Sequence, residues 1–194
     1  MILNYIPFYT PRVYLKIMSI QIYYKNKFSI KNPSNLILFV DEKFSSSPLK
    51  KHISNSEYAF VSDLIKNKDL KKNIASFDVS SKKKIILVSI KKNYSNSEIE
   101  NLGAKFYEQF NNSKIRNFYI NSNSLPSIDK NIVGYFLHGL NLKSYKFDKY
   151  KSKKNKNNIT INVLGKNIPS SKDQLKFKAI EEGTFYTRDL VSEP

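Results

Sequence analysis

Two short runs of this sequence are apolar at almost every position, and they constrain the fold more than any other feature. Leu36–Val40 reads Leu-Ile-Leu-Phe-Val, and Ile85–Ile90 reads Ile-Ile-Leu-Val-Ser-Ile. A strand of this composition presents apolar side chains on both faces, so it belongs in the middle of a sheet that is covered on both sides. The two runs therefore predict a layered domain with a central sheet.

Other segments have the patterns of further strands. Residues 20–24 and 159–163 alternate apolar side chains with mostly polar ones, as half-buried strands do. Residues 77–79 and 115–120 are short, largely apolar runs, and we expect a strand at each.

Helix starts are marked by capping boxes. Ser54 and Ser95 are each followed three residues later by a glutamate, and Ser171 is followed at the same spacing by Gln174. In this motif the serine oxygen accepts from the backbone of the third helical residue, while that residue's side chain reaches back to the cap amide. Asp129 can cap a further helix, and the last helix is expected to run from about Asp173 to Val191.

Each predicted helix carries apolar residues at helical spacing on one side. The four sets are Tyr58, Val61, Leu64 and Ile65; Ile99, Leu102, Phe106 and Phe110; Ile132, Val133, Phe136, Leu137 and Leu140; and Leu175, Ala179, Tyr186 and Leu190. Gly183 in the last helix allows a neighbouring element to approach closely. Strands and helices thus alternate along the chain, which predicts a three-layer α/β/α domain.

Composition narrows the class of protein. The 194 residues suffice for one domain, or a domain plus a tail, and no apolar run approaches the ~20 residues of a membrane span. The chain has no cysteine, so it forms neither a disulfide nor a thiolate metal site. These properties predict a soluble protein without a membrane partner and suit a reducing, cytoplasmic location.

The formal net charge of +17 has two interpretations. A surface this basic can bind a polyanion, because lysine and arginine side chains that contact phosphates release the counterions condensed on them. However, the 33 basic residues comprise 30 Lys and 3 Arg, alongside 22 Asn, whereas phosphate recognition favours arginine. An A/T-rich coding bias that leaves a solvated basic surface is the alternative.

The chain has two histidines, His52 and His138. His138 has no acidic or thiol partner three or four residues away on its predicted helix, so the local spacing does not indicate a metal ligand. A surface histidine, or one whose hydrogen bonds are satisfied within the fold, is the favoured interpretation.

Two segments resemble the leucyl aminopeptidase (cytosol aminopeptidase) family. The first is a Tyr-x-Phe-Asp-x-Tyr-Lys-Ser signature, formed by Tyr145, Phe147, Asp148, Tyr150, Lys151 and Ser152. The second is 181–194, which resembles the segment that leads from the N-terminal domain of that family into its catalytic domain. The two motifs lie about thirty residues apart, and element order extends the resemblance over about 18–194.

The resemblance implies an N-terminal α/β domain of macro-like architecture, joined by a long connecting helix to a catalytic domain. That catalytic domain, which would bind two divalent metals (manganese or zinc) and hydrolyse peptides, lies beyond Pro194, so this chain would be a fragment. No residue here matches the family's metal ligands or catalytic residues. The signature residues, together with Arg188 and Asp189, are interpreted as structural contacts.

The resemblance also implies partners. They are the chain's own catalytic domain and further copies in a hexamer, and in some bacterial members of the family this domain helps to bind DNA. Within this chain, the candidate polyanion-binding residues are Lys149, Lys151, Lys153, Lys154 and Lys156. Their neighbouring aromatic side chains could also stack on single-stranded nucleic acid. Nucleotide or ADP-ribose binding is a weaker alternative, because the glycines are too scattered for a phosphate cradle.

These interpretations divide the chain into three parts. Residues 1–17 are interpreted as an extension upstream of a true start at Met18, with a short N-terminal arm as the alternative. Residues 18–169 form the α/β domain, and 170–194 form the connecting helix. Tyr186 and Leu190 are expected to lack their usual partner in this chain, and the helix is expected to fray after about Thr187.

Overall fold

A computed structural model describes residues 20–27, 33–67, 70, 73–125, 131–148, 150 and 158–193. The described residues form a six-stranded sheet in the order β1-β6-β5-β2-β4-β3. All neighbouring strands run parallel except β3 and β4, which are antiparallel. The strands are β1 Ile20–Lys25, β2 Asn35–Asp41, β3 Ile74–Ser80, β4 Lys83–Ile90, β5 Asn117–Asn121 and β6 Ile159–Leu164.

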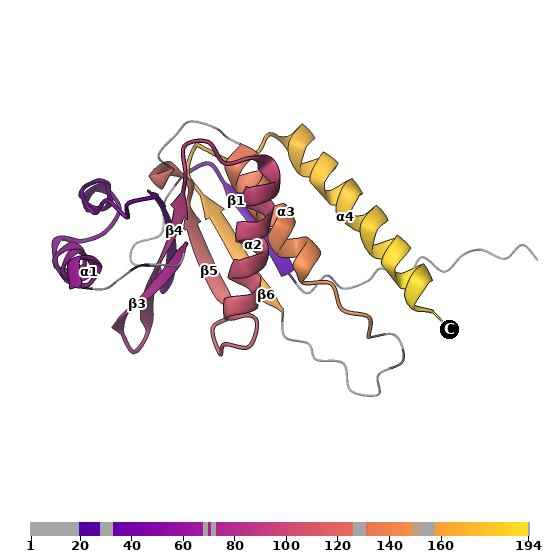
Figure 1. The fold of residues 1–194 in the computed structure, drawn as a ribbon, viewed down its shortest axis with the longest axis horizontal. Coiled ribbons are helices and arrows are strands. Elements are labelled where there is room, and N and C mark those ends of the chain that lie inside the picture. The colour runs from indigo at the N-terminus through magenta and orange to yellow at the C-terminus, as the bar shows by residue number, and fades with distance from the viewer. Residues whose placement is uncertain are drawn as a thin grey trace, which may run out of the picture.

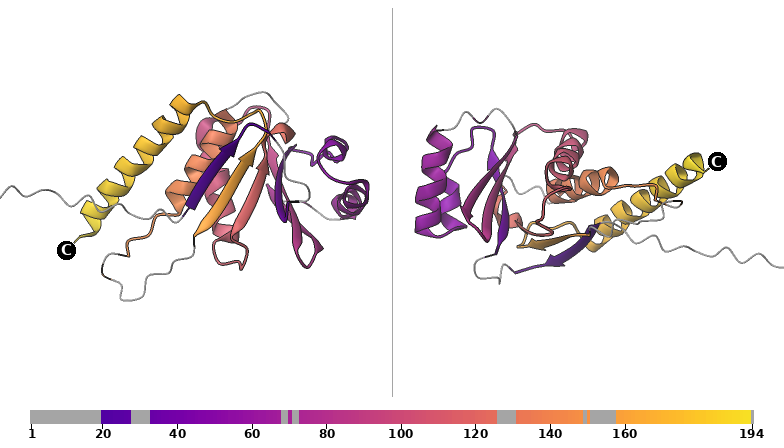
Figure 2. Two further views of the ribbon diagram at one scale, coloured as in Figure 1. Left: turned by 180° about the vertical axis from the view of Figure 1, so that it is seen from behind. Right: turned by 90° about the horizontal axis from the view of Figure 1, so that it is seen from below.

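Helices cover both faces of the sheet, as Figures 1 and 2 show. One face packs against α1, and the other packs against α2 and α3. The long helix α4 lies beside α3, away from the sheet. The predicted three-layer α/β/α architecture is confirmed. The helices are α1 Asn55–Asn67, α2 Asn96–Phe110, α3 Asn131–Lys143 and α4 Ser171–Ser192, with short 3-10 turns at η1 Ser47–Lys51 and η2 Ser122–Ser124.

The central strand β2 explains why its sequence is apolar throughout. Ile37 and Phe39 pack into the core beneath α2 and α3, whereas Leu36, Leu38 and Val40 pack into the core beneath α1. All five side chains are at most 3% exposed. Because successive strand residues point to opposite faces, a strand covered on both sides must be apolar at every position.

Local capping chemistry sets the helix starts. In α1, the Ser54 amide donates to a Glu57 carboxylate oxygen at 3.0 Å, and the Glu57 amide donates to the Ser54 hydroxyl at 3.4 Å. In α2, Ser95 and Glu98 form the same reciprocal pair. Both predicted capping boxes are confirmed.

The capping residue of α4 differs from the prediction by one residue. Ser170, and not Ser171, is the cap: its backbone is extended, and its hydroxyl accepts from the Asp173 amide at 3.1 Å. Asp173 then accepts from the Ser170 hydroxyl at 2.6 Å, while Gln174 donates to the Pro169 carbonyl. Each of the two adjacent serines has a hydroxyl that can cap a helix. Asp173, three residues after Ser170, pairs with Ser170 and so favours it as the cap.

Helix α4 continues to Ser192, one residue beyond the predicted end at Val191, and is helical beyond Thr187, where we expected its order to end. Three other sequence-based expectations, the extension 1–17, the start at Met18 and the cap at Asp129, lie outside the described residues. None of the helices in the described part of the chain is both long and apolar enough to cross a membrane.

Glycines bring α2 and α3 into direct backbone contact. A Cβ atom added at Gly103 would lie 1.9 Å from the Phe136 carbonyl oxygen, and one added at Gly139 would lie 1.9 Å from the Glu100 carbonyl oxygen. The neighbouring atoms are backbone and cannot rotate away. These two positions therefore fix how closely the helices on this face pack.

We expect Gly139→Ala to destabilise the protein by about 3 kcal/mol, because overpacking at a backbone contact outweighs the gain in helix propensity. Gly183→Ala is the matched control, since a Cβ there meets no heavy atom within 4 Å. That control should stabilise the protein by up to about 1 kcal/mol. Urea unfolding at low protein concentration measures both. Equal effects of the two substitutions would contradict the role given to the α2–α3 contact.

Candidate functional site

The two family-like motifs, far apart in sequence, meet where the end of α3 lies against the second half of α4. The Tyr145 hydroxyl donates to an Asp189 carboxylate oxygen at 2.7 Å. The Arg188 side chain donates to the Leu142 carbonyl at 2.8 Å, and its guanidinium lies 5.4 Å from the centre of the Tyr145 ring. The ring of Tyr145 also packs 5.5 Å from that of Phe185. We call this set of contacts the α3–α4 junction.

Each contact of the junction satisfies a physical need. The last carbonyls of a helix have no partner within the helix, and Arg188 supplies one for Leu142 near the end of α3. Burial raises the pKa of the Tyr145 hydroxyl, and its hydrogen bond to Asp189 raises it further. Tyr145 therefore stays protonated and remains a donor throughout the neutral pH range.

A buried polar cluster lies next to the junction. Glu181 accepts from His138 Nδ1 at 2.8 Å through one carboxylate oxygen and from the Asn141 side-chain amide through the other. Glu181, His138 and Asn141 are 6%, 5% and 1% exposed, respectively. When Glu181 is ionised its carboxylate only accepts, and Nδ1 of His138 is then the donor in this hydrogen bond. We call these three residues the Glu181 cluster.

The sequence did not predict the Glu181 cluster. His138 was expected to be at the surface or satisfied within the fold, and it is satisfied; its partner lies 43 residues away along the chain, beyond any helical spacing. The available signal was the position of His138 among the buried residues of α3, because a buried imidazole requires a hydrogen-bond partner.

An open pocket of about 790 Å³ lies between β1, α3 and α4. Its lining includes Tyr24, Phe177 and the three residues of the Glu181 cluster. Burial, together with the nearby carboxylate of Glu181, raises the pKa of Tyr24 well above its ordinary value. Both carboxylate oxygens of Glu181 already accept hydrogen bonds from α3, so the cluster fastens one helix to another.

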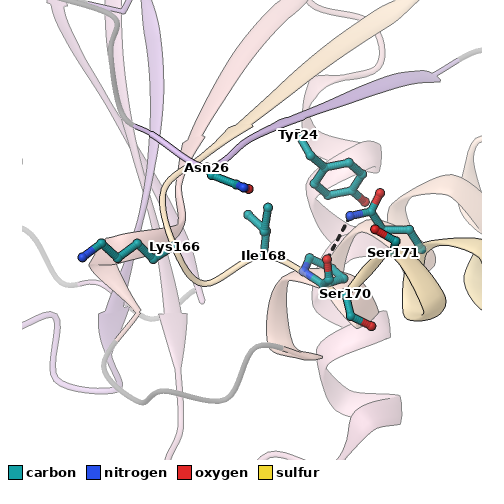
Figure 3. Close-up of a pocket in the computed structure, with 8 residues that line it drawn as sticks. Tyr24, Asn26, Lys166, Ile168, Ser170 and Ser171 are labelled. Atoms are coloured by element: carbon teal, nitrogen blue, oxygen red, sulfur yellow. Dashed lines mark hydrogen bonds between the residues drawn. The ribbon is translucent and has the colours of Figure 1, made fainter.

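A second pocket, of about 490 Å³, lies where β1 and β6 end and α4 begins (Figure 3). Tyr24, Lys166 and Ser170 line it. A helix start beside a lysine favours an anion in principle. Here, however, Asp173 already places a carboxylate in the first turn and accepts from Ser170, so the chain itself supplies the negative charge.

The remaining predicted site residues have less definite surroundings. The Phe147 ring packs edge-on against Tyr150, with 5.8 Å between ring centres, while Asp148 is partly buried. Tyr150 is 63% exposed. Residues 149 and 151–157 lie outside the described part of the chain, and they include the signature residue Lys151 and the candidate polyanion-binding residues Lys149, Lys153, Lys154 and Lys156.

The consecutive lysines at the start of β4 and the histidine His52 are residue types found in binding sites, but in this structure Lys83, Lys84 and His52 have partners within the fold. Lys83 pairs with Glu57, and Lys84 pairs with Asp78 at 2.5 Å, so two of the three consecutive lysines at this strand entry are engaged with carboxylates. The Asn121 side-chain amide donates to His52 Nδ1, and burial lowers the pKa of His52. The charges of Lys83 and Lys84 are thus balanced locally by carboxylates.

The described residues do not fit a metal centre. No three histidine, aspartate or glutamate side chains gather within this part of the chain in a way that could hold a metal ion. The site that the described residues build is an assembly of helix contacts.

Comparison with known proteins agrees with this fold. No family model matches the chain. Over 89 residues it is 36% identical to a protein described as a "Probable cytosol aminopeptidase" from Clostridium perfringens, an alignment that covers 42% of this chain and 18% of the relative. A mutant of tomato leucine aminopeptidase has a similar structure, with a TM-score of 0.64 and 17% identity. The resemblance to leucyl aminopeptidases is confirmed.

The resemblance is one-sided in length. The structural match covers 90% of this chain but only 38% of the tomato leucine aminopeptidase chain. The chain thus spans well under half the length of the leucyl aminopeptidases to which it is similar. What the tomato structure shows is a similarity of fold. In this chain that fold has a six-stranded sheet and a long last helix.

We expect Glu181→Leu to destabilise the protein by about 3 kcal/mol, because it leaves His138 and Asn141 buried without their acceptor. Replacing all three residues of the cluster with leucine should recover most of that loss, since an apolar cluster has no polar group to satisfy. The matched control is Glu182→Gln. Glu182 is exposed and lies 3.8 Å from Lys178, so its loss should change stability by less than about 0.5 kcal/mol. Chemical unfolding of the variants measures all three, and a mild effect of Glu181→Leu would contradict the fastening role.

Proposed function

We propose that this chain is a non-catalytic N-terminal domain of a leucyl aminopeptidase and that it serves in assembly. Such an enzyme is a two-metal exopeptidase that removes N-terminal residues, preferably leucine, from peptides. The single observation that carries the proposal is the α3–α4 junction. Both family motifs take part in it, and their residues contact each other through Tyr145, Arg188 and Asp189.

The junction suggests what the motifs do. A connecting helix transmits position only if its direction relative to the domain is fixed. The Glu181 cluster holds the middle of α4, and the Tyr145–Asp189 and Arg188–Leu142 contacts hold its second half. We propose that these residues set the angle at which α4 leaves the α/β domain, so that they are positioning residues and not catalytic ones.

The proposal assigns the chemistry to another part of the enzyme. In the family, two divalent metals (manganese or zinc) polarise the peptide carbonyl and activate water in the catalytic domain. On this proposal the partners of the chain are that catalytic domain and further copies of itself in a hexamer, peptides are the substrates of the whole enzyme, and the location is the cytoplasm. Residues 18–169 form the macro-like domain, and 170–194 form the connecting helix.

We expect the purified 194-residue chain to show no turnover of a leucine chromogenic substrate with manganese or zinc, because no set of its described residues fits a metal centre. A full-length cytosol aminopeptidase assayed under the same conditions is the positive control. Turnover that follows the chain through successive purification steps, and that is lost when the chain is unfolded, would overturn the proposal.

A second candidate function is binding to DNA or another polyanion. The observation that favours it is the net charge of +17. The paired lysines at the start of β4 and the near absence of arginine favour a solvated surface instead. Polyanion binding therefore ranks behind assembly.

Heparin chromatography distinguishes the two functions. If the charge only solvates the surface, the chain should elute at low salt, and its affinity for duplex DNA should be negligible at physiological ionic strength. True polyanion binding should instead persist to higher salt and weaken linearly with the logarithm of the salt concentration. Replacing Lys153, Lys154 and Lys156 with glutamine should then reduce the salt slope by about one for each phosphate that the variant no longer neutralises.

A further inference from the structure

Strand β1 leaves one edge of the sheet unpaired. Its neighbour on one side is β6, and no strand of the described part of the chain lies on its other side. The Lys25 carbonyl accepts from the Gly165 amide, just after β6, at 3.0 Å. Since successive residues of a strand direct their backbone groups to opposite sides, Ile20, Ile22 and Tyr24 direct theirs to the free edge. Such an edge is a template for another strand.

A cleft runs along this free edge. The pocket of about 790 Å³ is lined on one side by β1 and on another by α4, and Figure 2 shows β1 at the margin of the sheet with α4 beyond it. The pocket of about 490 Å³ (Figure 3) shares Tyr24, Ser171 and Gln174 with it, so the two join. We call this continuous space the β1–α4 cleft. At about 3.3 Å per residue, β1 gives it a wall roughly 20 Å long.

The walls of the β1–α4 cleft are largely apolar. Ile22 of β1, Leu137 of α3 and Phe177 of α4 line it, and so does Leu175, which is 68% exposed. Side chains of a strand alternate between its two faces. Every second side chain of a strand added to β1 would therefore point towards these walls. Apolar side chains at those positions would cover apolar surface that solvent now reaches.

The charges around the β1–α4 cleft favour an acidic occupant. Lys166 and Lys178 line it, and Lys25 is exposed at the end of β1. Among the described residues that line the cleft, Glu181 is the only acidic one, and both of its oxygens accept from α3. Lys178 also lies 3.8 Å from Glu182, but both side chains are 62% exposed, so this pair is weak. Negative charges beside the added strand would complement the lysines.

We propose that the β1–α4 cleft binds an extended, acidic segment of a partner protein, which pairs with the free edge of β1 as a seventh strand. In this mode of recognition, main-chain hydrogen bonds provide affinity, and the alternate side chains that enter the cleft provide specificity. A second β1 fits poorly as the occupant, because β1 contains no acidic residue and carries Lys25. The inference goes beyond the assembly role and stands on the cleft alone.

The first test asks whether the cleft selects strands. A random dodecapeptide library displayed on phage is selected against the full 194-residue chain. The enriched peptides should have apolar residues at every second position, with aspartate or glutamate beside them and no proline among them. An unenriched library, or an enriched set without this pattern, would overturn the proposal.

The second test asks whether the backbone of the peptide pairs with β1. The most enriched peptide is labelled with fluorescein, and its affinity is measured by fluorescence anisotropy. Two derivatives are then made, each methylated on the amides of one alternate set of residues. The derivative whose methyl groups face β1 should bind at least about 10-fold more weakly, while the other should bind like the parent. Similar affinities of the two derivatives would contradict strand addition.

The third test places the peptide in the cleft. Leu175→Glu should weaken binding of the acidic peptide at least about 10-fold, because it puts a carboxylate on the cleft wall. Leu190→Glu is the matched control: Leu190 is 56% exposed on the same helix and does not line the cleft, so affinity should change less than about 2-fold. Both residues are exposed, and unfolding curves verify that both variants are folded.

A further pair of variants separates the cleft from the basic surface as a whole. Lys178→Glu should weaken peptide binding more than Lys176→Glu, because Lys178 lines the cleft and the exposed Lys176 does not. Equal losses would show general attraction of an acidic peptide to a basic protein and overturn the proposal. Failure of these tests leaves the proposed function standing. Leucine aminopeptidase activity in the purified chain would contradict the proposed function but leave a measured peptide complex intact.

Discussion

The carboxylate of Glu181 is the contact on which the arrangement of the C-terminal half depends. It accepts from two side chains of α3 and thereby joins α4 to a helix that is itself packed on the sheet. A buried carboxylate is costly to desolvate, so it is tolerated only where hydrogen-bond donors of good geometry reach its oxygens. This requirement fixes the rotation of α4 about its own axis. The rotation in turn brings Phe185 inward and leaves Leu175, Tyr186 and Leu190 facing solvent.

The layer beneath α4 is fixed by a different kind of constraint. Gly103 and Gly139 allow the backbones of α2 and α3 to touch, and the aromatic rings of Phe39, Phe106 and Phe136 fill the space between these helices and the sheet. The ring pairs Phe39–Phe136 and Phe106–Phe136 meet edge to face, with centres 5.7 Å and 5.6 Å apart. This geometry is favourable for aromatic rings. Thus α3 has a fixed place on the sheet, and the Glu181 cluster together with the contacts of the α3–α4 junction orients α4 against it.

The sequence predicted the features that depend on neighbours along the chain. The apolar runs of β2 and β4 required cover on both faces, and Ser54 and Ser95 required helices to follow. It could not predict the Glu181 cluster, because nothing local relates residue 138 to residue 181. In α4, the predicted apolar side is exposed; it consists of Leu175, Ala179, Tyr186 and Leu190. The helix instead packs on α3 and on Tyr145 through Phe177, Glu181 and Phe185, a mixed polar and apolar set. Periodicity reveals a face but not which partner covers it.

The position of β1 has a consequence for how the chain folds. This first strand lies at the edge of the sheet, where β6, the last strand in sequence, is its neighbour, and Ile20 is in register with Ile159. Contacts of such large sequence separation form late and slowly, because the chain loses the entropy of closing a long loop before these contacts add stability. During synthesis, β1 therefore cannot pair with β6 until nearly all of the domain has left the ribosome. Completion of the sheet and the docking of α4, which directly follows β6, thus belong to the same late step of folding.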